Sequence, residues 1–211
     1  FRGMERIERL LTTIDRLGAT TIKQLYSIHG SELKSYRNAC MSFKKLQPYT
    51  NKTYFKKEKV LYLNKEGRSL IGSDKEVKQG GHLEHTLLRN EAYIFLKQPY
   101  DWEMEKVMEY SVQQPNKIDI VLKGVSVANK GRMVVDALYT RNGYTHLVEI
   151  DNKADMKDNH KKIKSYIECF KSLNTPKLEI FTLTENRKRT FEKWLSDYKL
   201  RGEIWTYNEL S

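Results

Sequence analysis

The stretch SELKSYRNACMSFKKLQPYTNKTYFKKEKVLYL, residues 31–63, decides how the first part of the chain folds. Ser31 is a helix-capping residue type, and the pattern after it predicts a helix over residues 32–46 that ends before Pro48. Residues 49–55 and 60–63 predict two short strands joined by basic residues. One face of the predicted helix carries Leu33, Tyr36, Cys40 and Phe43, and the opposite face carries Lys34, Asn38, Met41 and Lys45.

The flanking segments complete a small domain. Apolar residues at helical spacing predict a helix over residues 4–17, and Thr20 or Thr21 can cap a second short helix that stops at Gly30. A last helical turn, residues 65–71, follows the second strand. Three helices and then a hairpin is the order of a winged helix-turn-helix, so we expect such a domain over residues 4–72.

Charge indicates the partner of this domain. The chain of 211 residues has a net charge of +11. Residues 1–80 hold 17 Lys and Arg against 8 Asp and Glu, a net charge of +9. A basic winged helix predicts double-stranded DNA as the partner. Base reading is expected from Arg37, Asn38 and Ser42, because Asn can read adenine and Arg guanine. Phosphate contacts are expected from Lys34, Lys45, Lys56, Lys57 and Lys59.

Composition excludes several classes of protein. No run approaches the roughly 18 apolar residues that a membrane helix needs, so no membrane partner is expected. The two cysteines, Cys40 and Cys169, fall in helix-like segments, which argues against a disulfide framework and a four-cysteine zinc site. We therefore expect a cytoplasmic protein.

A second domain follows a polar linker. Residues 73–81 are polar and end in two glycines, which is typical of a linker. Residues 82–211 predict a helix at 82–97, an extended segment at 102–112, a less regular one at 117–122, and a hairpin whose strands, 133–139 and 144–151, are joined at Asn142-Gly143. A helix at 157–173, a strand at 178–183, a helix at 185–200 and a strand at 203–207 complete an α+β mixed sheet.

Acidic residues gather on this hairpin. Glu149, Asp151 and Lys153 share one side of a strand, and Asp136 lies on the strand before it. Adjacent carboxylates repel one another unless a cation or a proton neutralises them. Carboxylates suit Mg²⁺ or Mn²⁺, so Asp136, Glu149 and Asp151 are candidate metal ligands, and Lys153 completes a candidate catalytic set for phosphodiester hydrolysis.

The spacing resembles that of the PD-(D/E)xK nuclease fold, which has an αβββαβ core. Two registers stay open. Asp136 followed by Asp151-Asn152-Lys153 fits the letters of the motif, whereas Asp136 followed by Glu149-Ile150-Asp151 fits the usual hairpin length and puts Asp151 in place of the lysine. Val135 stands where the motif has proline.

Both halves together resemble the replication-relaxation family of plasmids and other mobile elements. The matching features are Leu61-Tyr62-Leu63-Asn64 before Lys65-Glu66-Gly67, His85 with Asn90, Val135-Asp136-Ala137-Leu138, and Glu149–Lys153 followed by Lys164-Ser165-Tyr166. The resemblance implies DNA binding in replication, transfer or transcriptional regulation.

Three hypotheses result. The first is a DNA-binding protein whose second domain is an inactive nuclease-like fold for homodimerisation or partner contact, with no cofactor. The second is a nuclease or nicking enzyme that uses Mg²⁺ or Mn²⁺. The third is an interaction module whose basic hairpin binds an acidic protein.

Overall fold

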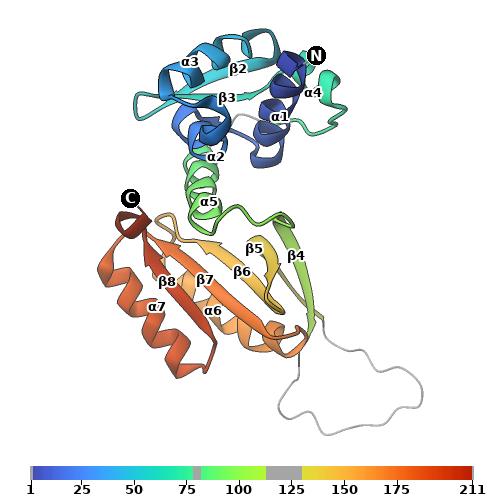
Figure 1. Ribbon diagram of the computed structural model, residues 1–211. Helices are drawn as coiled ribbons and strands as arrows, with labels where there is room; N and C mark the ends of the chain where they lie inside the picture. The colour runs from blue at the N-terminus through green and yellow to red at the C-terminus, as the bar shows by residue number, and fades with distance from the viewer. Residues whose placement is uncertain (1, 78–81, 113–129, 211) are drawn as a thin grey trace, which may run out of the picture. The chain divides into compact units, whose positions relative to one another are not determined.

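The computed structural model describes residues 2–77, 82–112 and 130–210, and it is an α+β structure (Figure 1). Its internal contacts divide the chain into two compact units, Phe1–Gln98 and Pro99–Ser211. Each unit has its own hydrophobic core.

The first unit is built from helices and a small sheet. In chain order its elements are α1 (Arg2–Leu17), β1 (Thr20–Thr21), α2 (Ile22–Leu33), α3 (Tyr36–Lys44), a 3₁₀ turn (Gln47–Tyr49), β2 (Thr50–Phe55), β3 (Glu58–Leu63), α4 (Lys65–Ile71) and α5 (Leu83–Phe95). The three strands are antiparallel in the order β1-β3-β2.

Alternation along β3 directs its side chains to two different cores. Leu61 and Leu63 join Leu10, Leu25 and Phe43 of α1, α2 and α3 in the main core of the unit. Val60 points the other way and packs with Ala19 and with Leu87 of α5. The hairpin therefore lies between the helical core and α5, with apolar residues on both of its faces.

The turn between α2 and α3 differs from the sequence-based expectation. Gly30 lies inside α2, and the turn is at Lys34 and Ser35, where Lys34 has φ 61°. The side chain of Ser35 accepts a hydrogen bond from the backbone amide of Asn38 (3.2 Å) and caps α3. Ser31, the cap expected from the sequence, instead lies inside α2. The expected helix start at residue 32 was therefore wrong.

The start of the second unit also differs from expectation. We expected residues 82–97 to open the second domain, but α5 belongs to the first unit. Asn90 Nδ2 donates to the Ala19 carbonyl (2.7 Å), and Gln24 Nε2 donates to Glu91 Oε1 (2.7 Å). These buried polar contacts add to the packing of Leu87, so α5 is tied to β1 and α2. Of the predicted linker 73–81, the structure describes only the part up to Val77.

The second unit is a five-stranded mixed sheet with two helices. Its elements are β4 (Glu103–Ser111), β5 (Lys130–Arg141), β6 (Tyr144–Ile150), α6 (Met156–Lys171), β7 (Pro176–Thr182), α7 (Glu185–Asp197), β8 (Gly202–Thr206) and a 3₁₀ turn (Tyr207–Leu210). The strand order is β4-β5-β6-β7-β8, antiparallel up to β6 and parallel beyond it. The predicted strand at 117–122 lies outside the described residues.

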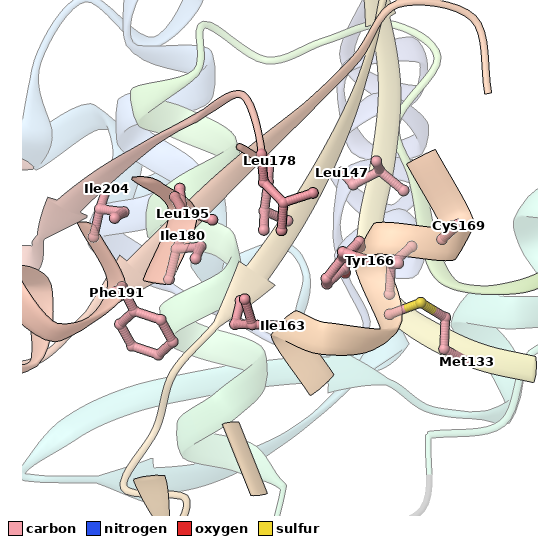
Figure 2. Close-up of a cluster of buried hydrophobic side chains, with 12 residues drawn as sticks. Met133, Leu147, Ile163, Tyr166, Cys169, Leu178, Ile180, Phe191, Leu195 and Ile204 are labelled. Carbon is pink, nitrogen blue, oxygen red and sulfur yellow. The ribbon is translucent and has the colours of Figure 1, made fainter. Parts of the chain in front are cut away.

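Helices α6 and α7 cover one face of this sheet. Their residues Ile163, Tyr166, Cys169, Phe191 and Leu195 meet strand residues such as Leu147 and Ile180 in one buried cluster (Figure 2). The expected hairpin turn is confirmed, because Asn142 and Gly143 have φ 53° and 79° between β5 and β6. The core thus fixes α6 directly above the strand that carries Glu149.

Candidate nucleic-acid interface and carboxylate cluster

An outward face of α3 carries polar and cationic side chains. Ala39 and Phe43 are buried and fix the rotation of the helix, which leaves Arg37 and Asn38 exposed. Lys34, exposed in the turn before α3, and Lys45, exposed just after it, line a groove of about 390 Å³ together with Asn38 and Ser42. Ser42 is only half-exposed. The corrected helix start therefore leaves these predicted DNA-binding residues accessible.

The tip of the β2–β3 hairpin is cationic. Lys56 and Lys57 form a two-residue turn with φ 46° and 68°. Lys56 differs from the expected phosphate contact, because its Nζ lies 3.1 Å from Glu84 Oε1 and 5.1 Å from the centre of the Phe55 ring. Lys57 is exposed and Lys59 is half-exposed, and neither makes an ion pair within the described part of the chain.

Several cations on and beside these two elements have no acidic partner within the described residues. Elsewhere in the unit Arg9 pairs with Glu32 and Lys23 pairs with Glu58, whereas Arg6, Lys65 and Arg68 also make no ion pair among the described residues. Within the described ranges, no ion pair involves Lys34, Arg37, Lys44, Lys45, Lys52, Lys57 or Lys59. Sequence reasoning did not select Lys44 and Lys52, although both are lysines on the segment that it singled out. This group of seven residues, here called the basic surface, has the charge that a polyanion requires.

In the second unit, Glu149 is the centre of a buried polar cluster. Its side chain is 8% exposed, and its Oε2 lies 2.5 Å from Lys162 Nζ, while Tyr166 donates its hydroxyl hydrogen to Oε1. Asp136 Oδ2 accepts a hydrogen bond from the backbone amide of Ile150 (2.7 Å). Pairing of Ala137 with Val148 puts Asp136 opposite Glu149. The structure thus brings two of the predicted carboxylates together.

Burial controls the protonation of this cluster. The pKa of Glu149 is raised to about 8, first by burial and then by the negative charge of Asp136, against the opposing effect of Lys162. Burial by itself would lower the pKa of Lys162. The negative charges of Glu149 and Asp136 raise this pKa by more than burial lowers it, so the net shift is upward. Lys162 therefore supplies the positive charge that we expected from Lys153. The two α6 residues Lys162 and Tyr166 are one helical turn apart, and Tyr166 also falls in the Lys164-Ser165-Tyr166 stretch of the family resemblance.

Asp151 is not part of the cluster around Glu149 and instead pairs with Arg187 of α7. Its carboxylate is buried, and both of its oxygens lie 2.6 Å from Arg187 nitrogens, in bidentate geometry. Thr182 Oγ1 and Asn159 Nδ2 donate to the same carboxylate at 2.6 and 2.9 Å. Lys153 is exposed after the end of β6. Of the predicted catalytic set, Asp136 and Glu149 thus form one group, and Asp151 belongs to a second group around Arg187.

The predicted metal site changes accordingly. We expected Asp136, Glu149 and Asp151 to share one cation, but Asp151 is neutralised by Arg187. Over residues 2–77, 82–112 and 130–210, no three His, Cys, Asp or Glu side chains are grouped so that they could hold a metal ion. Asp136 and Glu149 are the two carboxylates that remain together.

Comparisons with known proteins add little. The described helices are all too short or too polar to reach across a lipid bilayer. No protein-family model matches the chain, and no curated protein matches its sequence. A crystal structure of protein VC1899 from Vibrio cholerae is similar over 98% of this chain and 49% of that one, with 15% identity and a TM-score of 0.37. The chain thus spans about half the length of that protein.

Proposed function

We propose that this protein binds double-stranded DNA through α3 and the β2–β3 hairpin. The observation that carries the proposal is the basic surface, whose seven cations have no acidic partner within the described residues. Each lysine or arginine placed on a phosphate releases counterions from DNA, which gives affinity without reading sequence. The first unit would supply this affinity.

The arrangement of the first unit supports a winged-helix mode of binding. Its element order, α1-β1-α2-α3-β2-β3, and its sheet order, β1-β3-β2, are those that such a domain needs. In this mode α3 enters the major groove and the hairpin lies against the backbone. Arg37 and Asn38, exposed near the start of α3, would read base edges.

A salt series tests this proposal. If about six phosphates are neutralised, affinity for duplex DNA falls about a thousandfold between 50 and 200 mM salt. Fluorescence anisotropy on a labelled duplex measures this change. A flat response, or no binding at low salt, would refute the electrostatic basis and favour the third hypothesis, in which the hairpin binds an acidic protein.

For the second unit we propose a nuclease-like scaffold that serves dimerisation or partner contact. The support is that Lys162 and Tyr166 already satisfy Glu149, and Arg187 satisfies Asp151. The resemblance of the sequence to replication-relaxation proteins supports a role in replication, transfer or transcriptional regulation of a plasmid or mobile element.

A metal-dependent nuclease is the second candidate, and the adjacency of Asp136, Glu149 and Lys162 favours it. Two carboxylates and a lysine are groups that metal-assisted phosphodiester cleavage uses. A plasmid-nicking assay with Mn²⁺ separates the two roles. A scaffold gives no nicking, whereas metal-dependent nicking that is lost in Asp136→Asn would establish the nuclease.

A further inference from the structure

Tyr54 on β2 is an exposed aromatic side chain that takes no part in the hydrophobic clusters found among the described residues of the first unit. It is 62% exposed, the largest exposure among the large apolar and aromatic side chains described in the first unit. The other exposed ones there are Met4, Tyr36 and Met41. A single exposed tyrosine needs no explanation, so the residues around Tyr54 decide what it can bind.

Strand register gives the neighbours of Tyr54. Tyr54 pairs with Lys59 across the hairpin, and Lys52 pairs with Leu61. Paired residues and residues two apart share a face, so Lys52, Tyr54 and Lys59 extend the same face as Leu61. Leu61 is buried in the main core, whereas Tyr54 lies nearer the tip, beyond that core.

The opposite face of the hairpin is already covered. Phe55, Val60 and Tyr62 pack there with Leu83 and Leu87 of α5. The apolar residues on both faces are therefore accounted for within the first unit, and Tyr54 is the exception. Its nearest same-face neighbours toward solvent are two lysines, neither of which makes an ion pair within the described part of the chain.

A groove lined by two of the neighbours of Tyr54, Lys52 and Lys59, has room for a ligand. It has a volume of about 600 Å³, and Phe43 of α3 and Gln47 of the following 3₁₀ turn also line it. Asn51, Lys52 and Lys59 line it on the hairpin. The groove thus joins the end of the proposed base-reading helix to the lysines around Tyr54.

We propose that Tyr54, Lys52 and Lys59 bind an unpaired nucleotide next to the duplex held by α3. Unpaired bases stack on exposed aromatic rings, and cationic grooves follow the strand that carries them. Bases inside a duplex are stacked on each other and expose no face to a tyrosine. The proposal rests on the proposed DNA binding and names its substrate class: a duplex with a short single-stranded extension.

Anisotropy with two ligands tests this inference. The wild-type chain should bind a duplex with a short unpaired extension about tenfold more tightly than the same duplex with blunt ends, the order of magnitude of one stacked base. Tyr54→Leu should lose this preference, and Tyr54→Phe should keep it. Tyr100→Leu is the control, because Tyr100 is 86% exposed in the second unit. Equal melting temperatures verify that the variants fold.

A direct optical measurement accompanies the affinities. With 2-aminopurine at the first unpaired position, stacking on Tyr54 should quench its fluorescence in the wild type and not in Tyr54→Leu. Equal affinity for both ligands, or equal quenching in Tyr54→Leu, would overturn the inference while leaving duplex binding intact. Failure to bind either ligand would instead overturn the proposed function.

Discussion

Lys162 Nζ lies 2.5 Å from Glu149 Oε2, and this partly buried pair ties α6 to β6. Tyr166 reaches the other oxygen of Glu149 from the same helix. A carboxyl group in this setting keeps its proton to a much higher pH than one in water. Unfolding of the second unit is therefore coupled to pH, and the three tryptophans, Trp102, Trp194 and Trp205, all report on that unit.

We predict that Glu149 makes the second unit less stable as pH rises. Its pKa is about 8 in the fold, against 4.5 as its ordinary value. Between these values the folded chain holds a proton that the unfolded chain has released, so the free energy of unfolding falls as pH rises, by at most about 1.4 kcal/mol per pH unit.

Glu149→Gln cannot titrate and should flatten this dependence. Urea unfolding followed by tryptophan fluorescence at pH 5 and pH 8 measures the difference. Glu192→Gln, which changes an exposed carboxylate on α7, is the control and should keep the wild-type slope. An unchanged slope in Glu149→Gln would contradict the prediction.

Removing Arg187 should destabilise the second unit strongly. Arg187→Met leaves the Asp151 carboxylate buried without its cation, which costs about 3–5 kcal/mol in comparable cases. Arg189→Met on the same helix is the control, because Arg189 is exposed. The comparison uses urea unfolding with tryptophan emission. Equal stability of the two variants would show that Asp151 does not depend on Arg187.

Neighbouring lysines at the hairpin tip should differ in their effect on DNA affinity. Lys56 is paired with Glu84, whereas Lys57 makes no ion pair within the described ranges. We expect Lys57→Ala to weaken binding to every duplex alike and to lower the salt slope by about one, while Lys56→Ala changes both less. Anisotropy at several salt concentrations measures both quantities. A larger loss of affinity in Lys56→Ala than in Lys57→Ala would mean that the ion pair between Lys56 and Glu84 breaks when the protein binds DNA.

Arg37 and Asn38 should determine sequence preference. Arg37→Ala or Asn38→Ala should lower discrimination between a selected site and a scrambled duplex by about 1–3 kcal/mol for each good base contact. The selected site comes from enrichment of random duplexes by the wild-type chain. Lys44→Ala, also on α3, is the control and should weaken both duplexes equally. Equal losses on both duplexes for Asn38→Ala would mean that α3 does not read bases.

Local signals predicted much of the fold. The Asn142-Gly143 turn fixed the β5–β6 hairpin, because both residues tolerate positive φ. The start of α3 was misplaced because serine is a common cap at either position, and the structure continues α2 through Ser31 and caps α3 with Ser35. The sequence did not reveal that α5 belongs to the first unit, because the residues that Asn90 and Glu91 contact, Ala19 and Gln24, lie more than sixty residues away in sequence.

The carboxylate cluster was also predictable only in part. Strand alternation and pairing left both Glu149 and Asp151 open as neighbours of Asp136, and the register of the hairpin selects Glu149. The partners of Glu149 and Asp151 come from α6 and α7, and the angle at which a helix crosses a sheet is set by packing rather than by local pattern. Lys162 and Arg187 were therefore out of reach of reasoning based on the strand alone.

The two hairpin turns of this chain solve one conformational problem differently. Both need two consecutive residues with positive φ, and the β5–β6 turn uses Asn142 and Gly143, which adopt it readily. The β2–β3 turn uses Lys56 and Lys57 in the same region, where an ordinary side chain costs about 1–2 kcal/mol per residue. The lysines at the tip of the β2–β3 hairpin therefore carry a backbone cost that an Asn-Gly pair would avoid, so replacing Lys56-Lys57 with Asn-Gly would relieve strain and remove two cations at once.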